Sequence, residues 1–78
     1  MIDWHYSSAA VQAIIRHERN VAAMQALGIA ADVIRQLDAC IERVASSSVY
    51  SHEQLWDDAH RTVIEGKSIQ GWIDRWNR

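Results

Sequence analysis

The sequence holds four tryptophans, Trp4, Trp56, Trp72 and Trp76, in 78 residues that include no phenylalanine and no proline, and two of the four lie within the last seven residues. An indole removes on the order of 150–250 Å² from water when it is buried. In so short a chain these few side chains therefore decide which segments pack together. The pair near the C-terminus predicts that the last segment docks on the rest of the chain or on a partner.

Length and composition restrict the fold and the location. A chain of this length forms one domain, residues 1–78, and buries only about 60% of the surface of its unfolded state, so self-association would add to a marginal stability. The single cysteine, Cys40, excludes an intrachain disulfide. No stretch reaches the roughly 18 apolar residues of a membrane helix, and the first residues lack the pattern of a signal peptide. We therefore expect a cytoplasmic protein that does not enter a membrane.

Glycines and capping residues predict an all-α bundle of four helices without a sheet. Gly28 and Gly66 each follow a helical period and can take the left-handed backbone conformation that ends a helix. Ser51 and Gln54 have the spacing of a capping box, in which each side chain bonds the backbone N–H of the other residue. The predicted helices cover residues 8–27, 30–46, 52–65 and 69–76.

Three of these segments have a simple apolar face. In the segment 30–46 it includes Leu37 and Ile41, and in the segment 52–65 it includes Trp56. The last segment is too short to be stable alone and has a concentrated apolar face made by Ile69, Trp72, Ile73 and Trp76. Its tryptophans therefore lie either in the core of the bundle or in an interface, and the sequence leaves both open.

The first segment departs from this pattern. Its apolar arc contains Glu18 and Gln25 at the centre, seven residues apart, between Val11, Ile14, Ile15, Val21, Ala22 and Ala26. A helix at the edge of the bundle would leave Glu18 exposed or paired with an arginine. Alternatively, Glu18 and Gln25 set the register of a helix–helix interface, as single polar residues do in coiled coils. We expect this helix to begin at Ser7 or Ser8, with Asp3 as another candidate cap.

Residues that carry chemistry are not arranged as a site. The four histidines, His5, His17, His52 and His60, lack the i to i+4 spacing of a helical zinc pair. Cys40 lies within the apolar face of its helix, where a thiol acts as a small hydrophobic group. No glycine-rich loop that could cradle a phosphate is present. We expect neither catalysis nor a metal site, and no cofactor.

A DNA-associated role is an alternative. The segment Val63–Ile73 resembles the first helix and turn of a generic helix-turn-helix unit, and the whole of this degenerate unit would cover residues 55–78. The resemblance implies a small DNA-associated regulator in which the last helix reads DNA through Gln70, Arg75, Asn77 and Arg78. The net charge of −2 opposes this function, since a protein that binds nucleic acid usually has a basic face.

Recognition of another protein is the function that the composition favours. Tryptophan and arginine are enriched at interface hot spots, and seven of the eight basic residues are arginine. We expect a non-catalytic adaptor, subunit or inhibitor, such as a phage or plasmid protein that inhibits a host system, which docks on a larger protein and itself forms a homodimer. The expected contact residues at the C-terminus are Trp72, Trp76, Arg75 and Arg78. Glu18 and Gln25 form a second, polar contact face.

Overall fold

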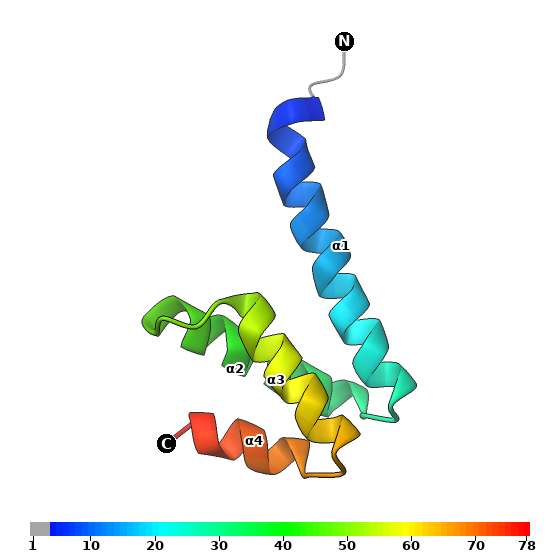
Figure 1. Cartoon of the computed structure of the whole chain (residues 1–78), viewed down its shortest axis with the longest axis vertical. Coiled ribbons are helices and arrows are strands. Elements are labelled where there is room, and N and C mark those ends of the chain that lie inside the picture. Colours follow the sequence, from blue (N-terminus) through cyan, green and yellow to red (C-terminus); the bar gives the residue numbers. More distant parts are fainter. Residues whose placement is uncertain (1–3) are drawn as a thin grey trace.

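The computed structural model describes residues 4–78, with side chains from Ala10 onward, and consists of four helices. They are α1 (Trp4–Ala26), α2 (Ala31–Ser47), α3 (His52–Ile64) and α4 (Ile69–Trp76), and no strand occurs between residues 4 and 78 (Figure 1). The prediction of an all-α bundle is therefore confirmed. The predicted bounds of the last three helices agree with the structure to within one residue.

The first helix begins earlier than predicted. Ser7 and Ser8 both lie inside α1, so the prediction that one of them caps this helix is wrong. Serine costs only a few tenths of a kcal/mol in a helix interior, and no glycine or proline precedes Ser7 to stop the helix. The alternative cap, Asp3, lies outside the described residues.

Both predicted stop signals act as expected. Gly28 and Gly66 have φ angles of 86° and 78°, in the left-handed region that other residues rarely adopt. The backbone N–H of Ile29 donates to the carbonyl of Met24 at 3.1 Å, and that of Lys67 donates to the carbonyl of Thr62 at 3.0 Å. These bonds satisfy the last carbonyls of α1 and α3, so both helices end in tight turns.

The capping box at the start of α3 is also present. The hydroxyl of Ser51 accepts a hydrogen bond from the backbone N–H of Gln54 at 3.2 Å, and the side chain of Gln54 accepts one from the backbone N–H of Ser51 at 2.8 Å. Two N–H groups that the helix itself leaves without partners are therefore satisfied.

Substitution of this cap should measurably destabilise the chain. We expect Ser51→Ala to lower the free energy of unfolding by about 1 kcal/mol, because it removes the acceptor for one N–H of the first turn. Urea denaturation followed by circular dichroism measures the change. Ser46→Ala is the control, since Ser46 lies inside α2 and bonds only the carbonyl of Glu42, so its stability should be unchanged or slightly raised. Equal losses in the two variants would contradict this role for Ser51.

The core is built mainly by α2, α3 and α4. α2 has the most buried side chains and packs against both α3 and α4. Helix α1 contributes one fully buried residue, Met24, among its side chains from Ala10 onward. The buried core residues are Met24, Ile34, Leu37, Cys40, Ile41, Val44, Leu55, Trp56, Ala59, Ile69, Trp72 and Ile73.

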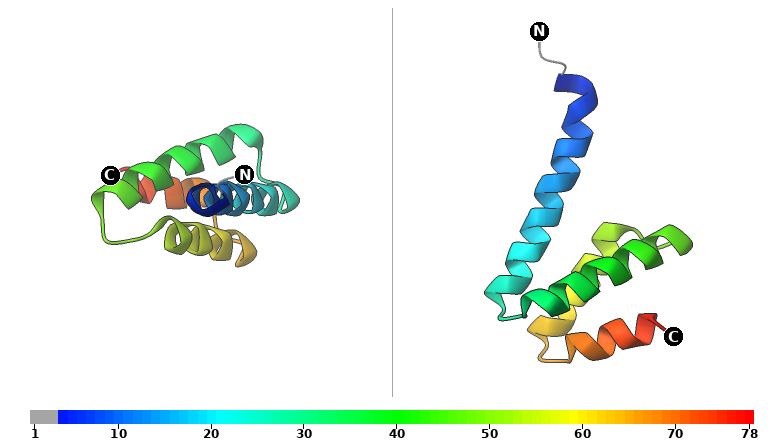
Figure 2. Two further views of the ribbon diagram at one scale, coloured as in Figure 1. Left: turned by 90° about the horizontal axis from the view of Figure 1, so that it is seen from above. Right: turned by 180° about the vertical axis from the view of Figure 1, so that it is seen from behind.

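Helix α1 is held at one end only. Its C-terminal part packs against α2 and α3, and its N-terminal part leads away from the other helices (Figures 1 and 2). The molecule is accordingly elongated, with principal extents of 48, 28 and 20 Å. The fold is thus a support of three helices, α2, α3 and α4, from which the N-terminal part of the long helix α1 projects.

Candidate functional site

The inner face of α1 joins it to the support through a mixture of polar and apolar contacts. The Arg16 guanidinium lies 2.5 Å from the carboxylate of Glu53, and His17 Nε2 lies 3.0 Å from Asp38 Oδ1. The His17 ring also meets Trp56 edge to face, with 6.0 Å between the ring centroids. Exposed polar contacts of this kind each contribute at most about 1 kcal/mol, so the apolar contacts of Met24 and of the partly buried Val21 carry most of the attachment.

The outer face of α1 carries large apolar side chains that no described part of the chain covers. Val11, Ile14 and Ile15 are 48%, 57% and 42% exposed. They continue toward the C-terminus of α1 into exposed smaller and polar residues on the same side, about a third of a turn from Met24. We call this surface the α1 stripe, and its residues are Val11, Ile14, Ile15, Glu18, Ala22 and Gln25.

The spacing within the α1 stripe is that of a coiled-coil seam. Val11, Ile15, Glu18, Ala22 and Gln25 follow one another at alternating intervals of four and three residues. That pattern keeps side chains in line along one side of a helix and suits packing against a second helix. The stripe is therefore shaped for a helical surface rather than for a small molecule.

The two polar residues of the stripe are both exposed. Glu18 forms no ion pair with the described side chains, so it does not have the arginine partner that was one of the two expectations. It is exposed on a helix at the edge of the bundle, which was the other expectation. Gln25 is exposed and borders a groove between α1 and α2. Both side chains are thus free to meet a partner.

The groove between α1 and α2 is open, with a volume of about 240 Å³. Ile34 forms a buried apolar surface within it. Sites for drug-sized ligands usually occupy about 300–1,000 Å³ and enclose most of the ligand, so this groove suits one or two protruding side chains. Its lining also includes Val21, Gln25, Ala31, His17 and Asp38.

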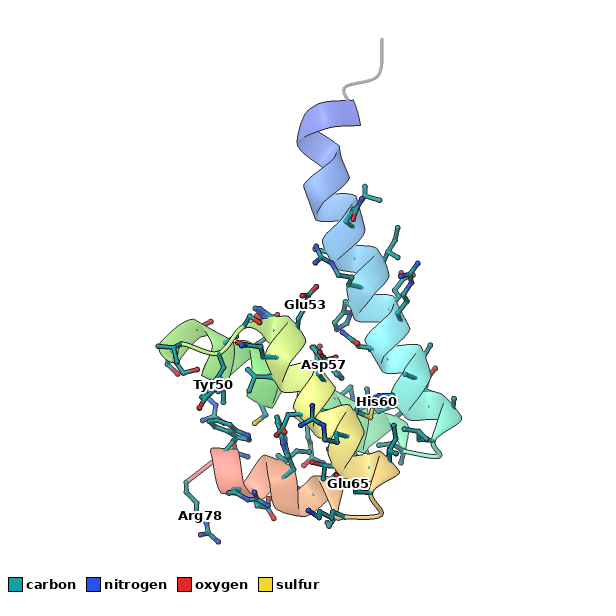
Figure 3. All side chains as sticks on the ribbon, viewed as in Figure 1. Tyr50, Glu53, Asp57, His60, Glu65 and Arg78 are labelled. Atoms are coloured by element: carbon teal, nitrogen blue, oxygen red, sulfur yellow. The ribbon has the colours of Figure 1, made fainter. Side chains whose placement is uncertain are left out.

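A second recess separates the diverging parts of α1 and α3 and is lined by charged and polar residues. Arg16, Arg19 and Asn20 of α1 face Glu53 and Asp57 of α3 across it. Figure 3 shows Glu53 and Asp57 on the side of α3 that is turned toward α1. Arg16 and Glu53 form the ion pair described above, which links the two walls of the recess.

At the C-terminus, the structure separates the two tryptophans that the sequence left together. Trp72 is 2% exposed, and its indole N–H donates to Asp58 Oδ2 at 2.7 Å. It belongs to the core, so its ring is not available to a partner in this conformation. Trp76 is only partly buried and packs against the core from its rim.

Trp76 lies within an exposed aromatic surface. Its ring meets Tyr50 edge to face, with centroids 5.7 Å apart, and Tyr50 is near the C-terminal end of α4 in Figure 3. Val49 is almost fully exposed beside it, and Arg75 and Arg78 are exposed on the same terminal segment. We call these five residues the C-terminal patch. Sequence reasoning missed Val49 and Tyr50, although two apolar residues in a polar connection were a visible signal.

The exposed face of α4 does not resemble a DNA-reading surface. Gln70 donates from its side-chain amide to Asp74 Oδ1 at 3.2 Å, so a carboxylate stands in the middle of the face that would meet phosphates. Burial of Trp72 is compatible with the helix-turn-helix interpretation, because a last helix that reads DNA through its polar side chains has to place its tryptophans in the core. The mixed charge of this face still disfavours binding to a polyanion.

Groups for catalysis or metal binding are scattered. Within the part of the chain that the structure describes, no three His, Cys, Asp or Glu side chains come together as a possible metal site. Cys40 is buried in the core.

None of the helices in the described part of the chain combines the length and the apolar character needed to cross a membrane. No protein-family model, curated protein or solved structure matches the chain.

Proposed function

We propose that this chain is a non-catalytic protein-interaction module that docks on its partner through the α1 stripe. The observation that carries the proposal is the exposure of Val11, Ile14 and Ile15 on one face of a helix that, from Ala10 onward, gives one buried residue to the core. Large apolar side chains in a contiguous exposed row commonly mark a binding surface. The other exposed large apolar side chains among the described residues lie at helix ends or in connections and form no such row along a helix: Leu27, Val49, Tyr50 and Ile64.

The division of the molecule supports the same proposal. The helices α2, α3 and α4 form a supporting unit, while the outer part of α1 projects away from them (Figure 2). The large apolar side chains on this part of α1 are exposed. A helix displayed in this way can lie along a helical surface of another protein, with anchors at positions i, i+3, i+4 and i+7. An adaptor, a subunit and an inhibitor all work by covering a partner's surface in this manner.

The C-terminal patch is the secondary contact surface in this proposal. Trp76, Arg75 and Arg78 remain candidate contact residues, now together with Tyr50 and Val49. Trp72 is not a candidate contact residue, because it is buried. The order of the two surfaces is therefore the reverse of the order that the tryptophans suggested.

Photo-crosslinking tests the proposal directly. A photoreactive amino acid placed at Ile14 should crosslink to a specific protein in the native host, and Ile15→Asp in the same chain should abolish the product. The control position is Ile64, which is 63% exposed on α3 and outside the stripe. Identical products from positions 14 and 64, or no product from position 14, would sink the proposal.

The DNA-associated alternative gives a separate result. Binding of duplex DNA at low salt that weakens steeply as salt rises, and that Arg75→Ala and Arg78→Ala reduce, would favour it. We expect no such salt-dependent binding, because the net charge of the chain is −2 and Asp74 lies beside Arg75. A filter-binding titration with the unmodified chain makes the comparison.

A further inference from the structure

We infer that the occupant of the α1 stripe is an amphipathic helix of another protein that carries an arginine or a lysine at the middle of its apolar face, opposite Glu18. This inference rests on the proposed function, because it takes the stripe as the docking surface and names the chemistry of the partner. Glu18 is then the residue that determines which helices can bind there.

Apolar side chains surround Glu18 on the surface of α1. Residues three and four positions away are the nearest neighbours on a helix, and for Glu18 they are Ile14, Ile15, Val21 and Ala22. Both isoleucines are largely exposed, and so is Ala22. A helix that packs on these apolar groups therefore also covers the carboxylate and displaces its water.

Glu18 has no cation of the described chain to replace that water, since it takes part in none of the ion pairs. Arg19 lies about 100° round the helix from it and lines the recess toward α3, where Glu53 and Asp57 form the opposite wall. An unpaired carboxylate costs far more to bury than one that is hydrogen-bonded to a cation. The partner therefore supplies the cation. Arginine suits this position best, because its fork of N–H groups can bind both carboxylate oxygens.

The position of Glu18 disfavours a second copy of α1 as the occupant. Glu18 lies at the midpoint of the stripe, seven residues after Val11 and seven residues before Gln25. In a parallel pair with the same register, Glu18 of one copy faces Glu18 of the other. The same holds in an antiparallel pair about a two-fold axis through the middle of the stripe. Two carboxylates would then repel each other at the centre of the interface, so a homodimer of this chain needs a different surface.

The sizes of the other stripe residues restrict the rest of the partner's apolar face. The N-terminal half of the stripe carries the large Val11 and Ile15, and the C-terminal half carries the small Ala22 and the amide of Gln25. Gln25 also borders the groove of about 240 Å³ between α1 and α2, which can receive a large side chain of the partner. From Val11 to Gln25 the stripe rises about 21 Å, so the partner's face spans about four helical turns.

Selection from a displayed peptide library tests the inference. The library consists of amphipathic helices of about four turns, with alanine, valine, leucine or isoleucine along the apolar face and any amino acid at its central position. The wild-type chain as bait should enrich arginine and lysine at that position, and the Glu18→Arg chain should enrich aspartate and glutamate there. Glu65→Arg is the matched control, because Glu65 is exposed at the end of α3 and outside the stripe. This variant should keep the wild-type preference.

The affinity of a selected peptide measures the pairing itself. Fluorescence anisotropy should show that Glu18→Arg binds a peptide with a central arginine at least about tenfold more weakly than the wild-type chain does. Exchange of that arginine for glutamate in the peptide should restore binding to the variant, because the two charges are then opposite again. Circular dichroism checks that Glu18→Arg and Glu65→Arg keep the wild-type helix content.

The outcomes separate the inference from the proposed function. A wild-type chain that enriches apolar or acidic residues at the central position, or that enriches no helix beyond the Ile15→Asp chain, overturns the inference. Crosslinks from position 14 that join two copies of this chain also overturn it, but they leave the stripe as the docking surface. The proposed function fails on its own test, when a photoreactive group at position 14 gives no product.

Discussion

Trp72→Ala should leave the chain largely unfolded at room temperature. Replacement of a buried tryptophan by alanine costs about 3–5 kcal/mol, and the core of so small a domain rarely supplies more than about that amount. The change also removes the hydrogen bond that the indole N–H of Trp72 donates to Asp58 Oδ2 at 2.7 Å. Far-UV circular dichroism during urea titration should show the loss of the cooperative transition.

Two further variants serve as controls, one at Trp72 that separates burial from hydrogen bonding and one at the partly exposed Trp76. Trp72→Phe keeps much of the apolar volume and loses the hydrogen bond, so it should retain a transition with stability lowered by about 1–3 kcal/mol. Trp76→Ala should cost less than Trp72→Ala, because Trp76 is partly exposed at the rim of the core. A Trp72→Ala chain that unfolds at the wild-type urea concentration would show that Trp72 is not a core residue.

Met24→Ala should cause the second largest effect, because Met24 is 1% exposed and is the buried contact of α1 with the support. Substitution of a buried methionine by alanine costs about 2–5 kcal/mol. Here the loss should free α1 from α2 and α3, and thermal unfolding should become broad and begin at a lower temperature. Differential scanning calorimetry measures both the midpoint and the width of the transition.

The matched control for this prediction is Ile14→Ala on the outer face of the same helix. The free energy of unfolding of a monomeric chain should change by less than about 0.5 kcal/mol, since most of the Ile14 side chain is already in water. Binding of a partner helix at the α1 stripe should weaken in this variant, although Met24 is intact. Equal destabilisation of the monomer by the two substitutions would mean that Ile14 packs within the chain.

The fold of residues 28–78 could be predicted well because its local signals agree with one another. Three kinds of local signal indicate the same helix boundaries: the apolar face of α2, the capping box of Ser51 and Gln54, and the two glycines in the left-handed conformation. The outcome for Trp72 could not be predicted in the same way. Whether a short amphipathic helix covers its own core or a partner depends on the position of α3, which places Asp58 against the indole N–H.

The orientation of α1 was the part that periodicity could not supply. Its most apolar arc predicts a face toward the core, yet Ile14 and Ile15 of that arc are 57% and 42% exposed, and only Val21 of the arc packs against the core. The side that packs inward combines Met24 with His17 and Arg16, whose partners lie on α2 and α3. The tight turn at Gly28 fixes the direction of α1 relative to α2, and this connection sets which side of α1 faces the support. A pattern of hydrophobicity along one helix contains no information about its neighbours.

The attachment of α1 at one end has a consequence for how such a chain can diversify. Residues 10–15 are all exposed, so they make little contribution to the stability of α2, α3 and α4. Substitutions in this part of α1 can therefore alter binding while the rest of the chain continues to fold. The three-helix support could in this way display many different recognition sequences on one unchanged scaffold, in nature or in the laboratory, as long as Met24 and the turn at Gly28 are kept.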